Sequence, residues 1–255
     1  MQNGEHTTKT EAAYQTLRKD ILETRLSPGQ HLKLGALRSA YGLGWTPLRE
    51  ALSRLEAERL VTAVSNRGFA VAPVSRAELE DLTRARQVIE VPLFIESIQN
   101  GGADWEEAVV TAHYRLSRCK LAVDDPSDEA VNEWDEKHQA FHAALLSAAK
   151  SRWLLRFRET ISDQLRRHHR FLGLAPTLRA AAGLKNGYEE AVTALREAMA
   201  LEHHTELMEA ALDRDIERAA ALMTEHIGYT LHVYIHAETE ATQAAPAKEK
   251  TPAGT

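Results

Sequence analysis

The residues that follow Ser75 carry only helical periods of apolar side chains, and this restricts most of the chain to one fold class. No stretch there shows the alternation of a strand. The expected helices span about residues 76–100, 104–120, 127–149, 151–173, 188–212 and 214–238, with a short turn of helix near 177–182. Such a set predicts an all-α bundle over residues 76–238. Pro92 should kink the first helix or lie near a break in it.

Residues 8–74 form a separate module in which three helices precede a β-hairpin. Apolar side chains at helical spacing mark the helices: Tyr14, Leu17 and Ile21, then Leu34, Leu37 and Tyr41, then Leu48, Leu52 and Leu55. Thr46 is the expected N-cap of the third helix, with Pro47 as its first residue. The fold class is therefore mainly α, an amino-terminal winged helix-turn-helix followed by the bundle.

The third helix is placed for recognition of DNA. Its buried leucines leave Arg49, Ser53 and Arg54 on more exposed faces. Two β-prone runs, residues 60–64 and 69–72, flank a turn that ends in Arg67 and Gly68. A hairpin directly after a recognition helix is the wing of a winged helix, and Arg67 at its tip could reach phosphates or the minor groove.

The charge of the chain is unevenly distributed. Residues 1–75 hold ten basic and seven acidic side chains, whereas the remainder holds twenty-one and thirty. This contrast suggests a small anion-binding module on an acidic body. The single cysteine, Cys119, excludes an intramolecular disulfide and a cysteine-based zinc site, which fits a cytoplasmic protein. We expect no signal peptide and no membrane span, and a disordered tail over residues 239–255.

Four histidines have the spacing of a metal site. His138 and His142 are four residues apart and share one helical face. A tight antiparallel turn near Asp213 would bring His204 and His226 to similar heights on two neighbouring helices. Neutral imidazoles suit zinc, nickel, copper and iron. The alternative is that these are ordinary surface or core histidines, since the chain has twelve.

The stretch Pro28–Pro73 resembles the DNA-binding domain of the GntR family of bacterial regulators. The residues that carry the resemblance are Pro28-Gly29, Thr46-Pro47-Leu48-Arg49-Glu50-Ala51-Leu52, Arg54-Leu55, Leu60-Val61 and Arg67-Gly68-Phe69. The resemblance implies DNA contacts from Arg49 in the recognition helix and from Arg67 and Gly68 in the wing, and we add Thr46, Ser53 and Arg54 as candidates. Trp45 and Gly35 stand where many members have arginine, so the operator sequence cannot be inferred.

The bundle resembles the ligand-binding domain of one branch of that family, often called FCD. The residues that carry this resemblance are Arg86-x-x-Ile89-Glu90, Phe141-His142-x-x-Leu145, His204-x-x-Leu207, Ala210, Asp215 and His226. Many members hold a divalent metal with one aspartate and three histidines, which correspond to His142, His204 and His226. His138 stands at the aspartate position, so four imidazoles are the expected ligands, and zinc or nickel is favoured over calcium or magnesium.

Several short strings are most similar to the carbon-starvation-induced, glutarate-responsive repressors of this branch. They are Glu133-Trp134-Asp135, His138-Gln139-Ala140-Phe141-His142 and Pro47-Leu48-Arg49-Glu50-Ala51-Leu52-Ser53, together with Ser151, where the branch commonly has asparagine. The resemblance implies glutarate or a similar small carboxylate as the effector, with Arg86 and Ser151 as candidate effector contacts. For Arg86 the alternative is an ion pair with Glu90 on a solvated face. A basic run, residues 166–170, is expected to face solvent.

These features predict a homodimer that binds double-stranded operator DNA and represses until the effector releases it. Activation is not excluded by the residues. Two readings from other classes stay open at this point, a helical-bundle metalloenzyme and a metal-stabilised scaffold protein. Paired Glu-x-x-His motifs of a di-metal bundle are missing, and Asp135-x-x-His138 is the nearest approach. The basic winged helix favours the regulator over both.

Overall fold

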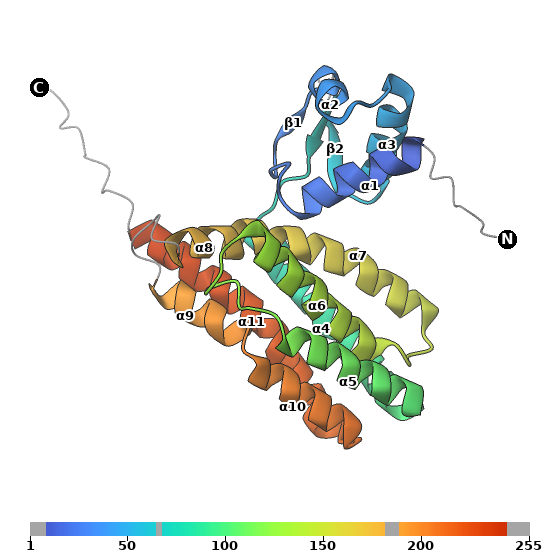
Figure 1. Cartoon of the computed structure of the whole chain (residues 1–255), viewed down its shortest axis with the longest axis vertical. Coiled ribbons are helices and arrows are strands. Elements are labelled where there is room, and N and C mark those ends of the chain that lie inside the picture. The colour runs from blue at the N-terminus through green and yellow to red at the C-terminus, as the bar shows by residue number, and fades with distance from the viewer. Residues whose placement is uncertain (1–8, 65–67, 182–188, 244–255) are drawn as a thin grey trace, which may run out of the picture. The chain divides into compact units, whose positions relative to one another are not determined.

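The computed structural model of the protein describes residues 9–64, 68–181 and 189–243 (Figure 1). The chain forms two compact units. One takes the residues up to Asn100 together with Ala148–Phe171, and the other takes Gly101–Ser147 together with the residues from Leu172 onward. The predicted fold class is confirmed: over the described residues, the strands all lie in the winged helix-turn-helix, and every regular element after it is a helix.

Three helices and a small antiparallel sheet form the amino-terminal part of the first unit (Figure 1). They are α1 (Lys9–Leu22), β1 (His31–Leu32), α2 (Leu34–Tyr41), α3 (Trp45–Ala57), β2 (Val61–Val64) and β3 (Gly68–Val71). β3 is the central strand, with Ala70 opposite His31 on β1 and Thr62 on β2. The hairpin of β2 and β3 is the predicted wing. The sequence gives no sign of β1, because two residues are too few to show alternation.

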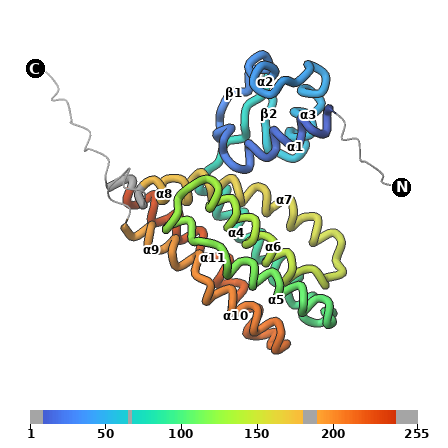
Figure 2. Tube along the Cα trace, in the orientation of Figure 1, coloured from blue at the N-terminus to red at the C-terminus, as the bar shows by residue number. Residues whose placement is uncertain are grey.

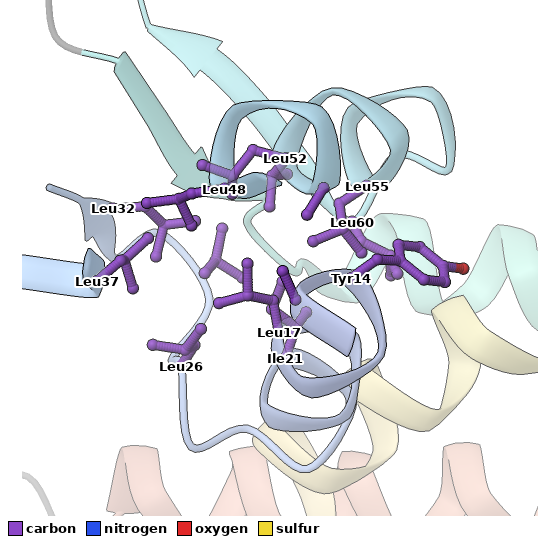
Figure 3. Close-up of a cluster of buried hydrophobic side chains, with 14 of the residues drawn as sticks. Tyr14, Leu17, Ile21, Leu26, Leu32, Leu37, Leu48, Leu52, Leu55 and Leu60 are labelled. Atoms are coloured by element: carbon purple, nitrogen blue, oxygen red, sulfur yellow. The ribbon is translucent and has the colours of Figure 1, made fainter. Parts of the chain in front are cut away.

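Leucines from all three helices and from the sheet fill the core of this module (Figure 3). The predicted apolar stripes of α1 and α3 meet there, and Leu17, Leu48 and Leu52 are fully buried. The stripe fixes the rotation of α3 about its axis, because burying one face of a helix turns the opposite face to solvent.

The recognition helix begins earlier than its sequence suggests. α3 starts at Trp45, and its N-cap is Gly44 in extended conformation rather than Thr46, so the predicted cap is wrong. Pro47 therefore lies in the first turn but not at its first position. The first four N–H groups of a helix lack intrahelical partners, so proline costs no hydrogen bond there. Gly42, in left-handed conformation at φ 65°, ends α2 and permits the sharp connection to α3.

Two long helices, α4 (Arg76–Asn100) and α7 (Arg152–His168), pack against each other and complete the first unit. α4 has the predicted bounds. It continues through Pro92 without a break, and the proline removes only one hydrogen bond from a helix of 25 residues. A π-helical segment, η1 (His169–Leu174), follows α7 directly.

Every regular element among the described residues of the second unit is a helix (Figure 2). Its helices are α5 (Ala103–Ser117), α6 (Asp128–Leu146), α8 (Ala175–Ala181), α9 (Glu189–Ala198), α10 (Leu201–Leu212) and α11 (Ile216–Gln243). α6 packs on α5, and α11 packs on both α9 and α10. No helix among the described residues is long and apolar enough to cross a membrane.

Two predicted boundaries in this unit are wrong. Residues 188–212 form two helices rather than one, since Met199 and Ala200 separate α9 from α10. α11 continues to Gln243, beyond residue 238, where the tail was expected to begin; residues 244–255 lie outside the described residues. The extension has a physical role, because the buried carboxylate of Glu240 accepts hydrogen bonds from the backbone N–H groups of Glu190 and Ala191 at the start of α9.

The basic run at the end of α7 is largely buried, contrary to the expectation that it faces solvent. Arg167 is 1% exposed and His168 is fully buried. Arg167 Nη1 donates to the carbonyl of Ala72 at 2.7 Å, and Nη2 donates to Gln164 Oε1 at 2.9 Å. Gln164 in turn donates to the carbonyl of Glu58, just after α3. These partners come from distant parts of the chain and cannot be read from the local sequence.

Arg167→Ala should lower the free energy of unfolding by about 3 kcal/mol, because it opens a cavity and leaves the carbonyl of Ala72 without its donor. Urea unfolding followed by circular dichroism measures the change. Arg152→Ala, on the exposed start of the same helix, is the matched control and should change stability by less than about 0.5 kcal/mol. Equal losses in the two variants would contradict the importance of the buried contacts.

Candidate metal centre and DNA-binding surface

Four histidines from three helices converge inside the second unit. α6 supplies His138 and His142, α10 supplies His204, and α11 supplies His226. One ring nitrogen from each lies within 4.8 Å of the others. His142, His204 and His226 are buried, and His138 is half-buried. The structure thus brings together all four residues that the sequence analysis singles out as metal ligands.

The turn between α10 and α11 places two of these histidines side by side. Arg214, in left-handed conformation at φ 59°, reverses the chain after Leu212. Asp215 then accepts the backbone N–H of Arg218 and caps α11. The ring centroids of His204 and His226 are 4.8 Å apart as a result. The predicted break near Asp213 is confirmed.

His204 shows most clearly the state required of a ligand. Its Nδ1 lies 2.8 Å from the carbonyl oxygen of Ala200, which can only accept, so Nδ1 carries the proton. Nε2 therefore presents a lone pair towards the cluster. It is buried and has no hydrogen-bond partner within the part of the chain that the structure describes. Burial lowers the pKa of His204 to about 4, so the ring is neutral at neutral pH.

The spacing of the ring nitrogens fits an ion. Nε2 of His142 lies 2.9 Å from Nε2 of His226 and 3.1 Å from Nε2 of His138. Imidazole nitrogens bind zinc at about 2.0–2.1 Å, so two nitrogens on one ion lie at most about 4.2 Å apart. The 4.8 Å spread therefore needs only small side-chain shifts to reach bonding distance. Four converging imidazole nitrogens, three of them from buried residues, are a donor set that suits a borderline transition metal.

Aromatic rings hold the imidazoles in place. Trp134, one helical turn before His138 on α6, stacks on it with ring centroids 4.5 Å apart and planes at 15°. The fully buried ring of Phe141 contacts His142 and His204 edge-on. Sequence reasoning missed Trp134 as a supporting residue, although its i, i+4 spacing to His138 was a usable signal.

Arg86 lies in a buried cluster of the first unit. Its Nε donates to Glu90 Oε2 at 2.9 Å, which is the ion pair considered as the alternative role for Arg86. The expected solvated face is wrong, because Arg86 is 9% exposed and Glu90 1%. Arg158 on α7 also donates to Glu90, at 3.3 Å, and no sequence signal pointed to it. Two guanidinium groups on one carboxylate leave the cluster with an excess positive charge.

Ser151, the other predicted effector contact, precedes α7 as its N-cap residue. Its side chain makes no capping hydrogen bond, and its backbone N–H donates to Glu96 Oε2 at 3.3 Å. Ser151 is half-buried within the first unit. The backbone of Ser151 is therefore held by Glu96, whereas its hydroxyl makes no capping contact.

The candidate DNA-binding side chains differ in how much freedom they have. Thr46, Arg49 and Ser53 are exposed on α3, and over the described residues Arg49 has no ion pair. Arg54 instead donates Nη1 to Glu11 Oε2 at 2.6 Å and lies 3.8 Å over the ring of Tyr14. Both of its partners belong to α1, so the guanidinium of Arg54 joins α3 to α1.

The wing supplies the remaining candidates. Gly68 begins β3 with φ 85°, a conformation that side chains disfavour, so glycine is required there. It is exposed. Arg67 lies outside the described residues.

Two family models match the chain. The model of the bacterial regulatory proteins of the gntR family covers residues 9–71, which span the winged helix. The FCD domain model covers residues 81–229, which include all four clustered histidines.

Curated relatives match over most of their length. The HTH-type transcriptional repressor GlaR of Escherichia coli K12 is 38% identical over 84% of this chain and 90% of its own. The uncharacterized HTH-type transcriptional regulator BphR of Paraburkholderia xenovorans LB400 is 35% identical over 88% and 84%. Among solved structures, Escherichia coli McbR/YncC superposes with a TM-score of 0.65 at 20% identity, over 91% of this chain and 98% of its own, and supports the fold.

Proposed function

The chain belongs to the GntR family of bacterial regulatory proteins, with an FCD domain, and we propose that it is an operator-binding repressor controlled by a small dicarboxylate and a metal. Members of this family are DNA-binding transcriptional regulators, so the metalloenzyme and scaffold readings of the sequence do not apply. The metal, the effector and repression are the proposed parts. The observation that carries the proposed metal is the convergence of four imidazole nitrogens within 4.8 Å.

The proposed ligands are His138, His142, His204 and His226, and the proposed ion is zinc or nickel. Four neutral nitrogens disfavour magnesium and calcium, which prefer oxygen. When bound, the ion would supply a positive charge and open coordination positions for a carboxylate oxygen. The protein's part is to hold His204 in the required tautomer through Ala200 and to keep His138 in place through Trp134.

Glutarate, or a similar small diacid, is the proposed effector. Arg86 remains the proposed contact of a carboxylate because its guanidinium fork matches carboxylate geometry. The excess positive charge that Arg158 adds to the Arg86–Glu90 pair supports this role, since an anion would neutralise it. Ser151 is proposed with Arg86 on the resemblance alone.

On the DNA side, Arg49 is the proposed reader of base edges, and Thr46, Ser53, Arg67 and Gly68 are proposed to contact the duplex around it. The ion pair of Arg54 with Glu11 supports a role for Arg54 in holding α1 rather than in reading bases. A homodimer is proposed because one winged helix reads one half-site and operators mirror two-fold symmetry. The relative GlaR is named as a transcriptional repressor, and we propose that this chain also represses transcription.

Glutarate at millimolar concentration should release the zinc-loaded protein from a labelled operator duplex, because an effector shifts a two-state equilibrium by its differential affinity for the two states. Fluorescence anisotropy measures the release. Pentanoate, which has the same chain length and one carboxylate, is the matched control and should release far less. Arg86→Met should abolish the difference between the two acids. Equal release by both acids from the unaltered protein would exclude a diacid effector while leaving the DNA-binding assignment intact.

A further inference from the structure

At the start of the recognition helix, an arginine lies over the ring of an exposed tryptophan. The guanidinium carbon of Arg38, on α2, lies 5.1 Å from the ring centroid of Trp45, the first residue of α3. This is within the range of a cation–π interaction. Trp45 is 48% exposed, the highest exposure of a large apolar side chain in the winged helix as described. An exposed tryptophan with a cation on it is a platform for a polar ligand rather than part of a core.

Arg38 has donors to offer. Its side chain is exposed, and among residues 9–64, 68–181 and 189–243 it makes no ion pair and no hydrogen bond. A cation–π contact occupies no hydrogen-bond acceptor, so the guanidinium N–H groups that point away from the ring stay available as donors. Arg18, Arg25 and Arg54 of the same module are each paired with a carboxylate. Arg38 therefore combines a fixed position with unused donors.

The position of the pair relative to α3 indicates what it meets. Trp45 and Arg49 are four residues apart on one helix, so they lie one above the other, and both border the buried stripe of Leu48 and Leu52 on its exposed side. If Arg49 enters the major groove, Trp45 lies one turn nearer the helix start, towards the edge of the groove. The helix that precedes a recognition helix crosses the DNA backbone. Arg38 is on that helix, and Gly35, one turn before it, has open space around its Cα.

We propose that Arg38, held against the indole of Trp45, binds a backbone phosphate of the operator and fixes the position of α3 in the groove. The inference rests on the proposed placement of α3 in the major groove. Phosphate is the chemistry that suits a guanidinium with free in-plane donors, and such contacts position a protein without reading sequence. Trp45 acts as a positioning residue, since it limits the rotamers of Arg38 before DNA arrives.

The test compares variants on two labelled duplexes, one that the unaltered protein selects from a randomised pool and a scrambled one of the same composition. Arg38→Gln should weaken binding to both by about tenfold and reduce the slope of log affinity against log salt by about 0.9 per site. Arg38→Lys should keep the slope, because the charge remains. Trp45→Leu should weaken binding only about threefold, and adding it to Arg38→Gln should cause no further loss.

Arg59→Gln is the matched control, because Arg59 is an exposed arginine at the opposite end of α3 and the variant has the same net charge as Arg38→Gln. It should leave affinity and slope unchanged. If the salt-dependence slope of Arg38→Gln equals that of the control, the proposal is overturned. It is also overturned if Arg38→Gln keeps the slope but tolerates other bases at one position of the duplex, because Arg38 would then be a base reader. If the unaltered protein selects no duplex from the pool, both the proposed function and the phosphate contact of Arg38 are wrong. If only the slope of Arg38→Gln is unchanged, the phosphate contact alone is wrong.

Discussion

Arg49→Ala is expected to abolish operator binding while leaving the fold and the metal content unchanged. A bidentate contact from arginine to a base is worth about 1–3 kcal/mol. A dimer loses two such contacts, and about 1.4 kcal/mol is a factor of ten, so affinity should fall at least about thirtyfold. Arg49 is exposed, and no ion pair of its side chain exists over the described residues, so its removal should cost little stability. Anisotropy of a labelled operator measures the affinity, and circular dichroism checks the fold.

Arg54→Ala is the informative comparison for Arg49→Ala, because the two arginines lie on the same helix and the sequence ranks both as candidates. Arg54 is engaged by Glu11 and Tyr14 of α1. Its replacement should lower affinity much less than that of Arg49. Equal losses from the two variants, or unchanged binding by Arg49→Ala, would contradict the assignment of α3 as the base-reading helix with Arg49 at its centre.

The winged helix was predictable because the apolar residues of its core recur at helical spacing within each of its helices. The leucines of α3 and the apolar stripe of α1 form the observed core, and the spacing of each stripe fixes which face is buried (Figure 3). The start of α3 was missed by two residues, since Gly44 and Thr46 are both acceptable caps and the backbone conformation chooses between them. Local sequence fixes the elements better than their ends.

Features decided by distant contacts were not predictable. The break at Met199 and Ala200 contains neither glycine nor proline, and only the burial of Met199 at 3% exposure marks it as a packed corner. Arg167 was expected to be solvated like the rest of its basic run, because its hydrogen-bond acceptor, the carbonyl of Ala72, is far away in the sequence. Of the four histidines, only His138 and His142 were paired by spacing alone. His204 and His226 were added on the condition of a chain reversal near Asp213, and the left-handed conformation of Arg214 supplies that reversal.

The double variant His142→Ala with His204→Ala is expected to remove bound metal completely and to blunt the response to the effector. Loss of an outer-shell partner alone costs metal affinity about 10–100-fold, so loss of two ligand nitrogens should leave none after dialysis. Elemental analysis of the dialysed protein gives the stoichiometry. Thermal unfolding gives a second readout: zinc at about 1,000 times its dissociation constant should stabilise the unaltered protein by about 4 kcal/mol and the double variant not at all.

His203→Ala is the matched control for the double variant, because His203 neighbours His204 on α10 but is not part of the four-histidine cluster. It should keep both the metal and the zinc-dependent stabilisation. DNA binding without effector should survive in the double variant, since the winged helix contains none of the four ligands. Stoichiometric metal retained by the double variant would show that the ion is held elsewhere. Metal lost equally from His203→Ala would show that the loss reflects general disturbance of α10 rather than removal of ligands.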